Sequence, residues 1–163
     1  THVIVDNMPY KANYATGKPF AIGVLPPGIH TVRVFASRSW HESVKSPGSF
    51  KTVTFFVGDT AGASPIAPGK PLLTYSRPKD VYEGEQARAI LVDFYLTNCT
   101  LSADGYKARL TVDGKSSLLT AWVPYLVSGL APGEHRFKLE LLDKAGKIGP
   151  GVYNATERTI TVK

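Results

Sequence analysis

The sequence predicts an all-β protein, and three observations carry that prediction. Gly and Pro occur 15 and 12 times among 163 residues, more often than helical proteins usually require. Most β-branched and aromatic residues fall in short runs between these turn-forming residues. No segment keeps a helical hydrophobic period long enough for a capped helix. We therefore expect many short strands joined by turns, with helix as a minor component.

An internal repeat organises these strands. Three landmarks recur in the same order: a strand that ends in an Asp turn, a Pro-Gly corner that ends in His, and a final alternating strand. The matched pairs are Val3–Asn7 with Leu110–Gly114, Leu25–His30 with Leu130–His135, and Lys51–Phe55 with Arg158–Val162. Their order and nearly constant separation indicate two diverged copies of one unit.

The Pro-Gly corners predict where strands begin. In each corner Pro presets the turn and Gly supplies a positive φ, and a strand with one apolar face follows, at 31–36 and at 136–141. The turn residues are Pro27, Gly28, Pro132 and Gly133. Both corners should therefore lead into hairpin strands.

The Asp turns predict where strands end. Asp6-Asn7 and Asp113-Gly114 tolerate left-handed backbone, so each is expected to close a tight turn into the next strand. At such positions Asp has a structural rather than a catalytic role.

The repeat sets the domain organisation. Residues 1–57 form the first copy, residues 58–71 are a small, Pro-rich linker, and residues 72–163 form the second copy. Strands predicted at 72–76 and 89–97 have no equivalents ahead of the first copy, so that copy is expected to be incomplete. Its opening strands lie upstream of Thr1, or its edge is covered by the second copy or by another chain. The sequence does not choose among these alternatives.

Net charge, cysteine count and the length of the apolar runs restrict the partners and the cellular location that the chain can have. The formal charge is +6 with a pI near 9.4, but the basic residues are dispersed along alternating strands and form no compact patch, which argues against nucleic acid as a partner. Cys99 is the only cysteine, so an internal disulfide is excluded. No apolar run approaches the roughly 20 residues that cross a bilayer. We expect a trimmed targeting segment before Thr1, with an upstream membrane tether as an open alternative.

Several segments resemble a known family. The runs His2–Asp6 and Leu25–Val34 resemble the strand, Asp-turn and L-x-x-G-x-H-T pattern of bacterial extracytoplasmic immunoglobulin-like repeats. Leu141–Lys147 is similar to the D-x-x-G hairpin of those modules. Ser37–Ser43 and Leu72–Lys79 are similar to segments of tandem β-sandwich proteins from photosynthetic and environmental bacteria. The resemblance implies two immunoglobulin-like β-sandwiches, the first incomplete, in the periplasm or at the cell surface. It implies no catalytic residue.

The histidines are the candidates for a metal site. His30 and His135 follow the two corners at equivalent positions, so we expect them to cap or orient the turn. A site made of His2, His30 and His41 in the first copy is the metal alternative, although the spacing lacks a metal-binding core motif. No cofactor is predicted.

Other catalytic signatures are missing from the sequence. It contains no nucleophile elbow, phosphate loop, dinucleotide fingerprint or paired cysteines. Cys99 is interpreted as a small, partly buried residue, and no pair of carboxylates indicates acid/base chemistry. Asn98-Cys99-Thr100 and Asn154-Ala155-Thr156 match the glycosylation pattern, which matters only in a eukaryotic secretory setting. The chain is predicted not to be an enzyme.

A long polar loop between strands 31–36 and 50–57 carries the first candidate binding residues, Arg38, Trp40 and His41. An exposed Trp40 would stack on a sugar ring or anchor a protein partner. We favour the other interpretation, in which Trp40 folds back over one end of the core.

Trp122 and Tyr125 are the candidate binding residues of the second copy. Strand alternation would place them on opposite faces, while Pro124 between them indicates an edge strand or a bulge. Core positions are the favoured interpretation for both.

Repetition without recognisable chemistry favours a non-catalytic structural or protein-interaction module of the cell envelope, such as an accessory subunit of a larger complex. The alternative is a carbohydrate-binding module, indicated by the basic charge, the tyrosines and the two tryptophans. A metal-dependent enzyme using His2, His30 and His41 ranks last. The expected partner is another protein or protein complex, with a glycan as the alternative.

Overall fold

The computed structural model describes residues 1–15, 17–58, 62 and 64–163. The structure is nearly all β, with 49% strand and 3% helix, which confirms the all-β prediction. The chain divides into two compact units, unit 1 (Thr1–Ala67) and unit 2 (Pro68–Lys163). Their boundary lies inside the segment 58–71 that the sequence predicts as a linker, and residues 59–61 and 63 of that segment lie outside the described residues.

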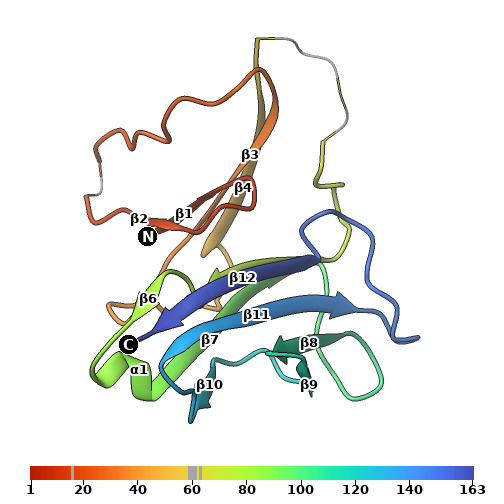
Figure 1. Cartoon of the computed structure of the whole chain (residues 1–163). Helices are drawn as coiled ribbons and strands as arrows, with labels where there is room; N and C mark the ends of the chain where they lie inside the picture. Colours follow the sequence, from red (N-terminus) through yellow and green to blue (C-terminus); the bar gives the residue numbers. More distant parts are fainter. Residues whose placement is uncertain (16, 59–61, 63) are drawn as a thin grey trace. The chain divides into compact units, whose positions relative to one another are not determined.

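The described residues of unit 1 form one antiparallel sheet (Figure 1). Its strand order is β2–β1–β3–β4. The strands are β1 (His2–Val5), β2 (Lys11–Ala12), β3 (Gly28–Phe35) and β4 (Phe50–Val57). Val34 of β3 lies opposite Val3 of β1, and Val32 lies opposite both Val5 and Val53. Because strand residues alternate between faces, these valines share one face of the sheet.

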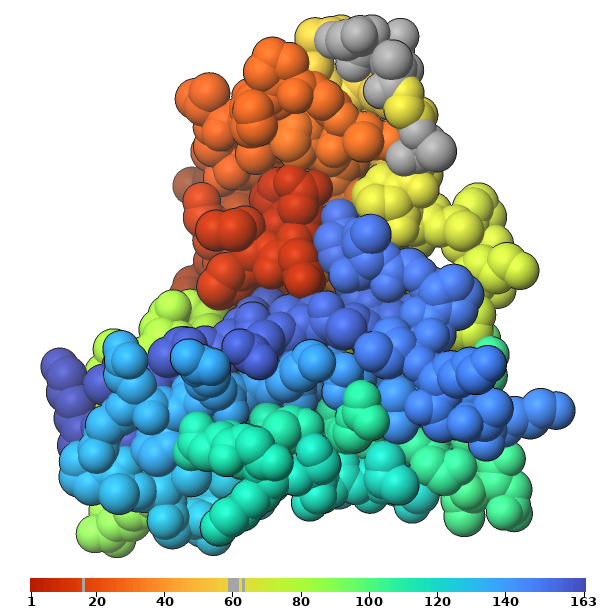
Figure 2. Space-filling model, turned by 45° about the vertical axis from the view of Figure 1, so that its right-hand side comes forward, coloured from red at the N-terminus to blue at the C-terminus, as the bar shows by residue number. Residues whose placement is uncertain are grey.

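Unit 2 contains two sheets (Figure 1). The smaller has the order β10–β7–β5, and the larger has the order β6–β12–β11–β8–β9. The smaller sheet contains β5 (Leu72–Arg77), β7 (Ala89–Thr97) and β10 (Tyr125–Ser128). The larger contains β6 (Val81–Tyr82), β8 (Lys107–Val112), β9 (Lys115–Leu119), β11 (Gly133–Leu142) and β12 (Ala155–Val162). The one-turn helix α1 (Glu85–Arg88) precedes β7. In Figure 2 the strands β8, β9, β11 and β12 of the larger sheet, coloured from teal to dark blue, lie side by side on the surface.

Both sheets of unit 2 contribute to one hydrophobic core, so the unit is a sandwich-like structure. Alternate residues of β7, namely Ile90, Val92 and Phe94, are fully buried. From the larger sheet, Phe137 and Leu139 of β11 are equally inaccessible. Burial of such side chains contributes about 1.5–3 kcal/mol each, which makes this core the main source of stability for the unit.

The Asp113-Gly114 turn is as predicted. It joins β8 to β9 directly, with Val112 opposite Lys115, and φ is 47° at Asp113 and 83° at Gly114. Two consecutive positive φ values match the twist of a two-residue hairpin, and only residues such as Asp and Gly adopt them easily.

The corresponding turn in unit 1 differs from the prediction of a tight hairpin. Asp6 does have a positive φ of 50°, and the Met8 N–H donates to the Val5 carbonyl at 3.0 Å. However, β2 begins only at Lys11. The reason is local: the chain has Asn where the second copy has Gly, and Pro9 has no N–H to extend the ladder.

The first two repeat landmarks coincide in the structure. Val3 pairs with Val34 in unit 1, and Leu110 pairs with Leu139 in unit 2, at the positions that the sequence match equates. The strands β1 and β3 of unit 1 therefore correspond to β8 and β11 of unit 2.

The third landmark is shifted. Val32 lies opposite Val53, whereas the equivalent Phe137 lies opposite Arg158. The sequence match equates Lys51 with Arg158, so the structure moves the equivalence by two residues along the strand. An even shift keeps every side chain on its face, which is why the apolar pattern alone did not reveal it.

One buried arginine ties the sheets of unit 2 together. The β5–β7 register shifts between Tyr75 and Arg77. At this irregularity the Arg158 guanidinium of β12 donates to the Ser76 carbonyl at 3.0 Å and to the Tyr75 carbonyl at 3.1 Å. It also lies 4.3 Å from the Tyr75 ring centroid. Arg158 thus satisfies carbonyls where the regular ladder of β5 is interrupted.

Candidate functional site

In unit 1 the Pro-Gly corner is fastened by Asp6 and His30. The Nδ1 atom of His30 lies 2.8 Å from Asp6 Oδ2, and its Nε2 lies 2.9 Å from the Pro26 carbonyl oxygen. The other carboxylate oxygen of Asp6 accepts the Thr31 N–H at 2.9 Å. His30 is buried, with 6% of its surface exposed. The prediction that His30 orients the turn is confirmed.

Unit 2 repeats this arrangement. His135 Nδ1 lies 2.6 Å from Asp113 Oδ2, and Nε2 lies 2.7 Å from the Ala131 carbonyl oxygen. Asp113 Oδ1 accepts the Arg136 N–H at 2.8 Å. Each Asp therefore joins the end of one strand to the start of another, and the structural roles predicted for Asp6 and Asp113 are confirmed.

The two imidazoles sit between oxygen acceptors, which affects their protonation. Hydrogen bonds to Asp6 and to Asp113 raise the pKa of His30 and of His135, respectively, above the ordinary value of 6.5. The carbonyls of the two corners act in the same direction. Reciprocally, the hydrogen bond from His135 lowers the pKa of Asp113 below its ordinary 3.8.

The histidines do not converge on a metal site. Both nitrogens of His30 are used by the corner, so the alternative site of His2, His30 and His41 is wrong. His2 and His41 do meet, with Nε2 and Nδ1 3.1 Å apart, and the His2 ring stacks on Tyr10 at 3.5 Å between centroids. In the part of the chain that the structure describes, no group of three or more His, Cys, Asp or Glu side chains is placed to hold a metal ion.

The loop between β3 and β4 contains a small hairpin whose tip carries Trp40. An isolated bridge joins Ser37 to Ser43, and the Arg38 N–H donates to the Glu42 carbonyl at 2.8 Å. His41 closes the tip with a positive φ of 70°. We call residues 37–43 the Trp40 hairpin.

Trp40 is exposed, which contradicts the favoured interpretation that it covers the core. Its exposed fraction is 58%. The indole N–H donates to Glu42 Oε2 at 2.8 Å, and the Arg38 guanidinium carbon lies 5.4 Å from the ring centroid. The contacts with Glu42 and Arg38 hold the ring at the tip of the hairpin, where it stays exposed instead of packing in a hydrophobic core.

Trp122 and Tyr125 both make hydrogen bonds within unit 2. The Trp122 indole N–H donates to the Phe94 carbonyl at 2.8 Å, and its ring meets Tyr95 edge to face at 4.9 Å. The Tyr125 hydroxyl donates to the Ala121 carbonyl at 2.8 Å. Both rings pack against the core of unit 2. The placement on opposite faces depended on a regular strand through both residues, and that condition is not met, because β10 begins only at Tyr125 and Trp122 precedes it.

No model of a known protein family matches the chain, and no curated protein resembles it significantly in sequence. Among the residues that the structure describes, no helix is both long and apolar enough to cross a bilayer.

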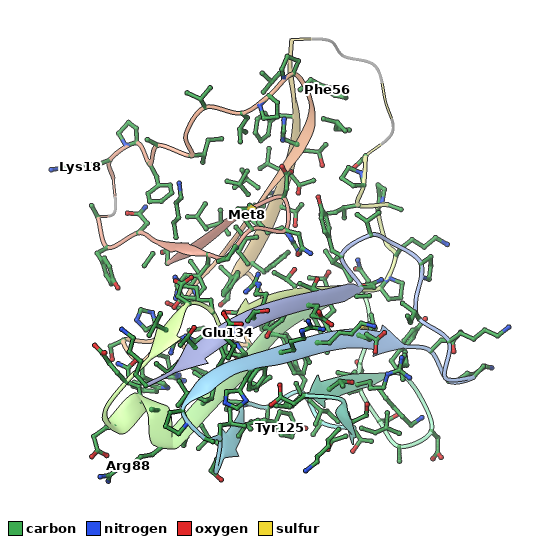
Figure 3. All side chains as sticks on the ribbon, viewed as in Figure 1. Met8, Lys18, Phe56, Arg88, Tyr125 and Glu134 are labelled. Carbon is green, nitrogen blue, oxygen red and sulfur yellow. The ribbon has the colours of Figure 1, made fainter. Side chains whose placement is uncertain are left out.

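Sequence reasoning missed a groove in unit 1. The segment between β2 and β3, outside Thr16, contributes apolar side chains to a cavity of about 180 Å³. The lining residues are Val3, Val5, Asp6, Met8, Pro9, Lys11, Phe20, Ile22 and Leu25. Figure 3 labels Met8, which is one of these lining residues. Lys18, in the segment between β2 and β3, points away from the unit in the same view. The apolar residues among Gly and Pro at 20–25 were the available signal, but a segment without strand or helix period gives no direction to its side chains.

Asn154, which lies in a glycosylation motif, and Cys99, the single cysteine of the sequence, both lie within the packed structure of unit 2. Asn154 is fully buried. Its Oδ1 accepts the Leu73 N–H at 2.8 Å, and its Nδ2 donates to the Pro71 and Pro150 carbonyls at 2.9 and 2.7 Å. Its amide is therefore not accessible to a modifying enzyme in the folded unit. Burial raises the pKa of the Cys99 thiol to about 11, so the reactive thiolate is scarce at neutral pH.

Proposed function

We propose that the chain is a non-catalytic structural and protein-interaction module of the cell envelope, acting as an accessory subunit of a larger complex. The observation that carries this proposal is the difference between the two units. Unit 2 has two sheets around one core, whereas the described residues of unit 1 form a single sheet.

The repeat indicates which face of unit 1 a partner would cover. Val3 and Val34 correspond to Leu110 and Leu139 of unit 2, whose side chains belong to the core beneath the smaller sheet. In unit 1 this face carries the groove, and Val53 on β4 is 50% exposed. Burial of such apolar surface by a partner is favourable by about 25 cal/mol per Å².

The strand order of unit 2 supports an immunoglobulin-like interpretation. In that fold strands A, B and E share one sheet, and strands C, F and G share the other. Here β5, β7 and β10 share the smaller sheet, and β8, β11 and β12 share the larger, extended by β6 and β9. On this interpretation, β1, β3 and β4 of unit 1 are the counterparts of C, F and G, and β2 lies beside β1 as β9 lies beside β8. A segment of the partner would take the place of strands A, B and E, which have no counterparts in the described residues of unit 1.

The Trp40 hairpin supplies a second contact point. A tryptophan that is already oriented by Arg38 and Glu42 loses little freedom on binding, and such aromatic anchors dominate many interfaces. The same exposed ring suits stacking on a sugar, so carbohydrate binding is the second candidate function. For that candidate Trp122 no longer counts, because its ring packs in unit 2.

The test uses the purified chain as bait in an envelope extract of the native source, with retained proteins quantified by mass spectrometry. Val53→Asp places a charge on the sheet face of unit 1, and Trp40→Ala removes the hairpin anchor. Leu126→Asp in unit 2, at a side chain with 68% of its surface exposed, is the matched control. Thermal unfolding of each variant checks that it is folded.

We expect a stoichiometric protein partner that the control retains, that Val53→Asp loses, and that Trp40→Ala retains at least tenfold less. A partner retained equally by all three variants would contradict the proposed surfaces. If no protein is retained and the chain binds envelope polysaccharide through Trp40, the carbohydrate-binding function replaces the proposal.

A further inference from the structure

The fastened corner is the most closely repeated side-chain arrangement of the two units. Each imidazole contacts a carboxylate through Nδ1 and a turn carbonyl through Nε2. The distances are 2.8 and 2.9 Å in unit 1 and 2.6 and 2.7 Å in unit 2. In both units the second carboxylate oxygen accepts the backbone N–H of the residue after the His. The repeat has thus kept a complete hydrogen-bond set and not merely two residue types.

Protonated histidine satisfies every contact of this geometry. A neutral imidazole has one N–H and one lone pair, whereas the imidazolium has two N–H donors. In both corners each ring nitrogen faces an oxygen that can only accept. Neutral His can satisfy one of these oxygens and must direct a lone pair at the other. Because a carboxylate is the stronger acceptor, the remaining proton stays on Nδ1, and the contact that fails is the one to the turn carbonyl.

We propose that the two corners are matched proton-dependent clamps, each of which holds its Pro-Gly turn against the strand pair while the histidine is protonated and releases the turn carbonyl when the histidine is neutral. In unit 1 the released group is the Pro26 carbonyl, directly ahead of β3. In unit 2 it is the Ala131 carbonyl, directly ahead of β11.

The surroundings make each clamp local to its unit. Asp6 is the charged side chain that faces His30, and the neighbour from β4 is the apolar ring of Phe55, 5.8 Å away between centroids. Asp113 faces His135, whose partner on β12 is the apolar Ile160. The two histidines should therefore titrate independently of each other.

The direction of the pH dependence follows from the raised pKa of each histidine. The protonated clamp stabilises its unit fully below the ordinary histidine pKa of 6.5, and this contribution is lost as the pH rises through the raised value. At the acid end, the lowered pKa of Asp113 acts in the opposite sense: its contribution is present above 3.8 and is lost as the pH falls through the lowered value. Unit 2 should therefore hold its turn most firmly between these limits.

The test is an NMR titration of the whole chain labelled with ¹⁵N in histidine and ¹³C in backbone carbonyls. At pH 6 we expect both ring nitrogens of His30 and His135 to carry protons. As the pH rises, the carbonyl shifts of Pro26 and Ala131 should move together with the histidine of the same corner, at a pKa above 6.5. A neutral ring at pH 6, or carbonyl shifts that ignore the histidine titration, would overturn the proposal.

Two carboxylate variants serve as mutual controls. Asp113→Asn keeps an oxygen for the Arg136 N–H but removes the charge, so it should lower the pKa of His135 and leave that of His30 unchanged. Asp6→Asn should do the reverse. If either substitution moves both histidines equally, or moves neither, the clamps are not local devices. Should a variant fail to fold, the titration of the unmodified chain still decides the question.

Discussion

Single polar side chains hold the structure together where its regular ladders end. Arg158 binds two carbonyls at the irregularity of β5. Asn154 binds two backbone groups near the start of the same strand and the Pro150 carbonyl. Each is buried, so the energy at stake is the desolvation of the backbone groups that would lose a partner. Stability at this scale thus depends on a few side chains that composition and periodicity do not reveal.

Asn154→Ala should lower the free energy of unfolding of unit 2 by about 3 kcal/mol, because it leaves buried backbone groups without partners. Asn98→Gly is the control. It removes one exposed hydrogen bond to the Lys70 carbonyl and keeps the positive φ of 59° accessible, and we expect a change within about 0.5 kcal/mol. Urea unfolding followed by tryptophan fluorescence measures both. A loss below about 1 kcal/mol for Asn154→Ala would show that water replaces the three bonds.

Cys99 should react slowly with alkylating reagents at neutral pH. Its pKa of about 11 leaves few thiolates at pH 8, and each pH unit should raise the alkylation rate about tenfold until that pKa is approached. Iodoacetamide labelling followed by mass spectrometry from pH 7 to pH 10 measures the profile, with free cysteine as the reference. A plateau near pH 9 would mean that the thiol is solvated in solution.

At the scale of elements, local chemistry made some features predictable. The Asp113-Gly114 hairpin and both Pro-Gly corners are encoded by adjacent residues, so the sequence was sufficient. The exposure of Trp40 was not predictable, because it depends on a bridge between Ser37 and Ser43 and on side chains that meet only in the folded loop. The metal alternative failed for the same reason, since the partners of His30 come from other parts of the unit.

The corner of unit 2 provides the element-scale prediction. Gly133 has a φ of 138°, a region nearly closed to other residues, although a Cβ added there would meet no other atom within 4 Å. Gly133→Ala should therefore destabilise unit 2 by about 1–3 kcal/mol through backbone strain alone. Ala131→Gly, at an exposed position of the same corner, is the comparison and should change stability by no more than about 1 kcal/mol. Thermal unfolding of both variants measures the difference, and equal losses would refute the role of φ.

At the scale of the molecule, the two copies are unequal. The core of unit 2 is built from residues of its own two sheets, whereas the described part of unit 1 offers a four-stranded sheet and the 13–27 segment, apart from Thr16. The sequence predicted this asymmetry, because strands 72–76 and 89–97 had no counterparts in the first copy. It did not predict the groove, since no periodic pattern links Phe20, Ile22 and Leu25 to the strands that they approach.

A chain trimmed to residues 68–163 should therefore fold alone. We expect a monomer with dispersed amide resonances and one cooperative unfolding transition, because every member of its core is retained. Residues 1–67 alone should show weak amide protection, since a unit of this size whose described residues form one sheet buries too small a fraction of its surface for independent stability. Analytical ultracentrifugation and proton NMR of both fragments decide the matter. A stably folded 1–67 fragment would remove the need for a partner on its sheet face.

The two-residue offset of the last repeat landmark has an evolutionary consequence. The same number of residues separates Val32 from its partner Val53 as separates Phe137 from its partner Arg158. The pairing ladder is thus the same in the two units, while the residue motif is displaced along it by two positions. Period-two alternation allows such drift in even steps only. Two units that descend from one ancestor can therefore lose their residue identities in an alignment while every core-facing position stays core-facing. In such proteins, the pairing partners of the strands record common ancestry better than residue identities do.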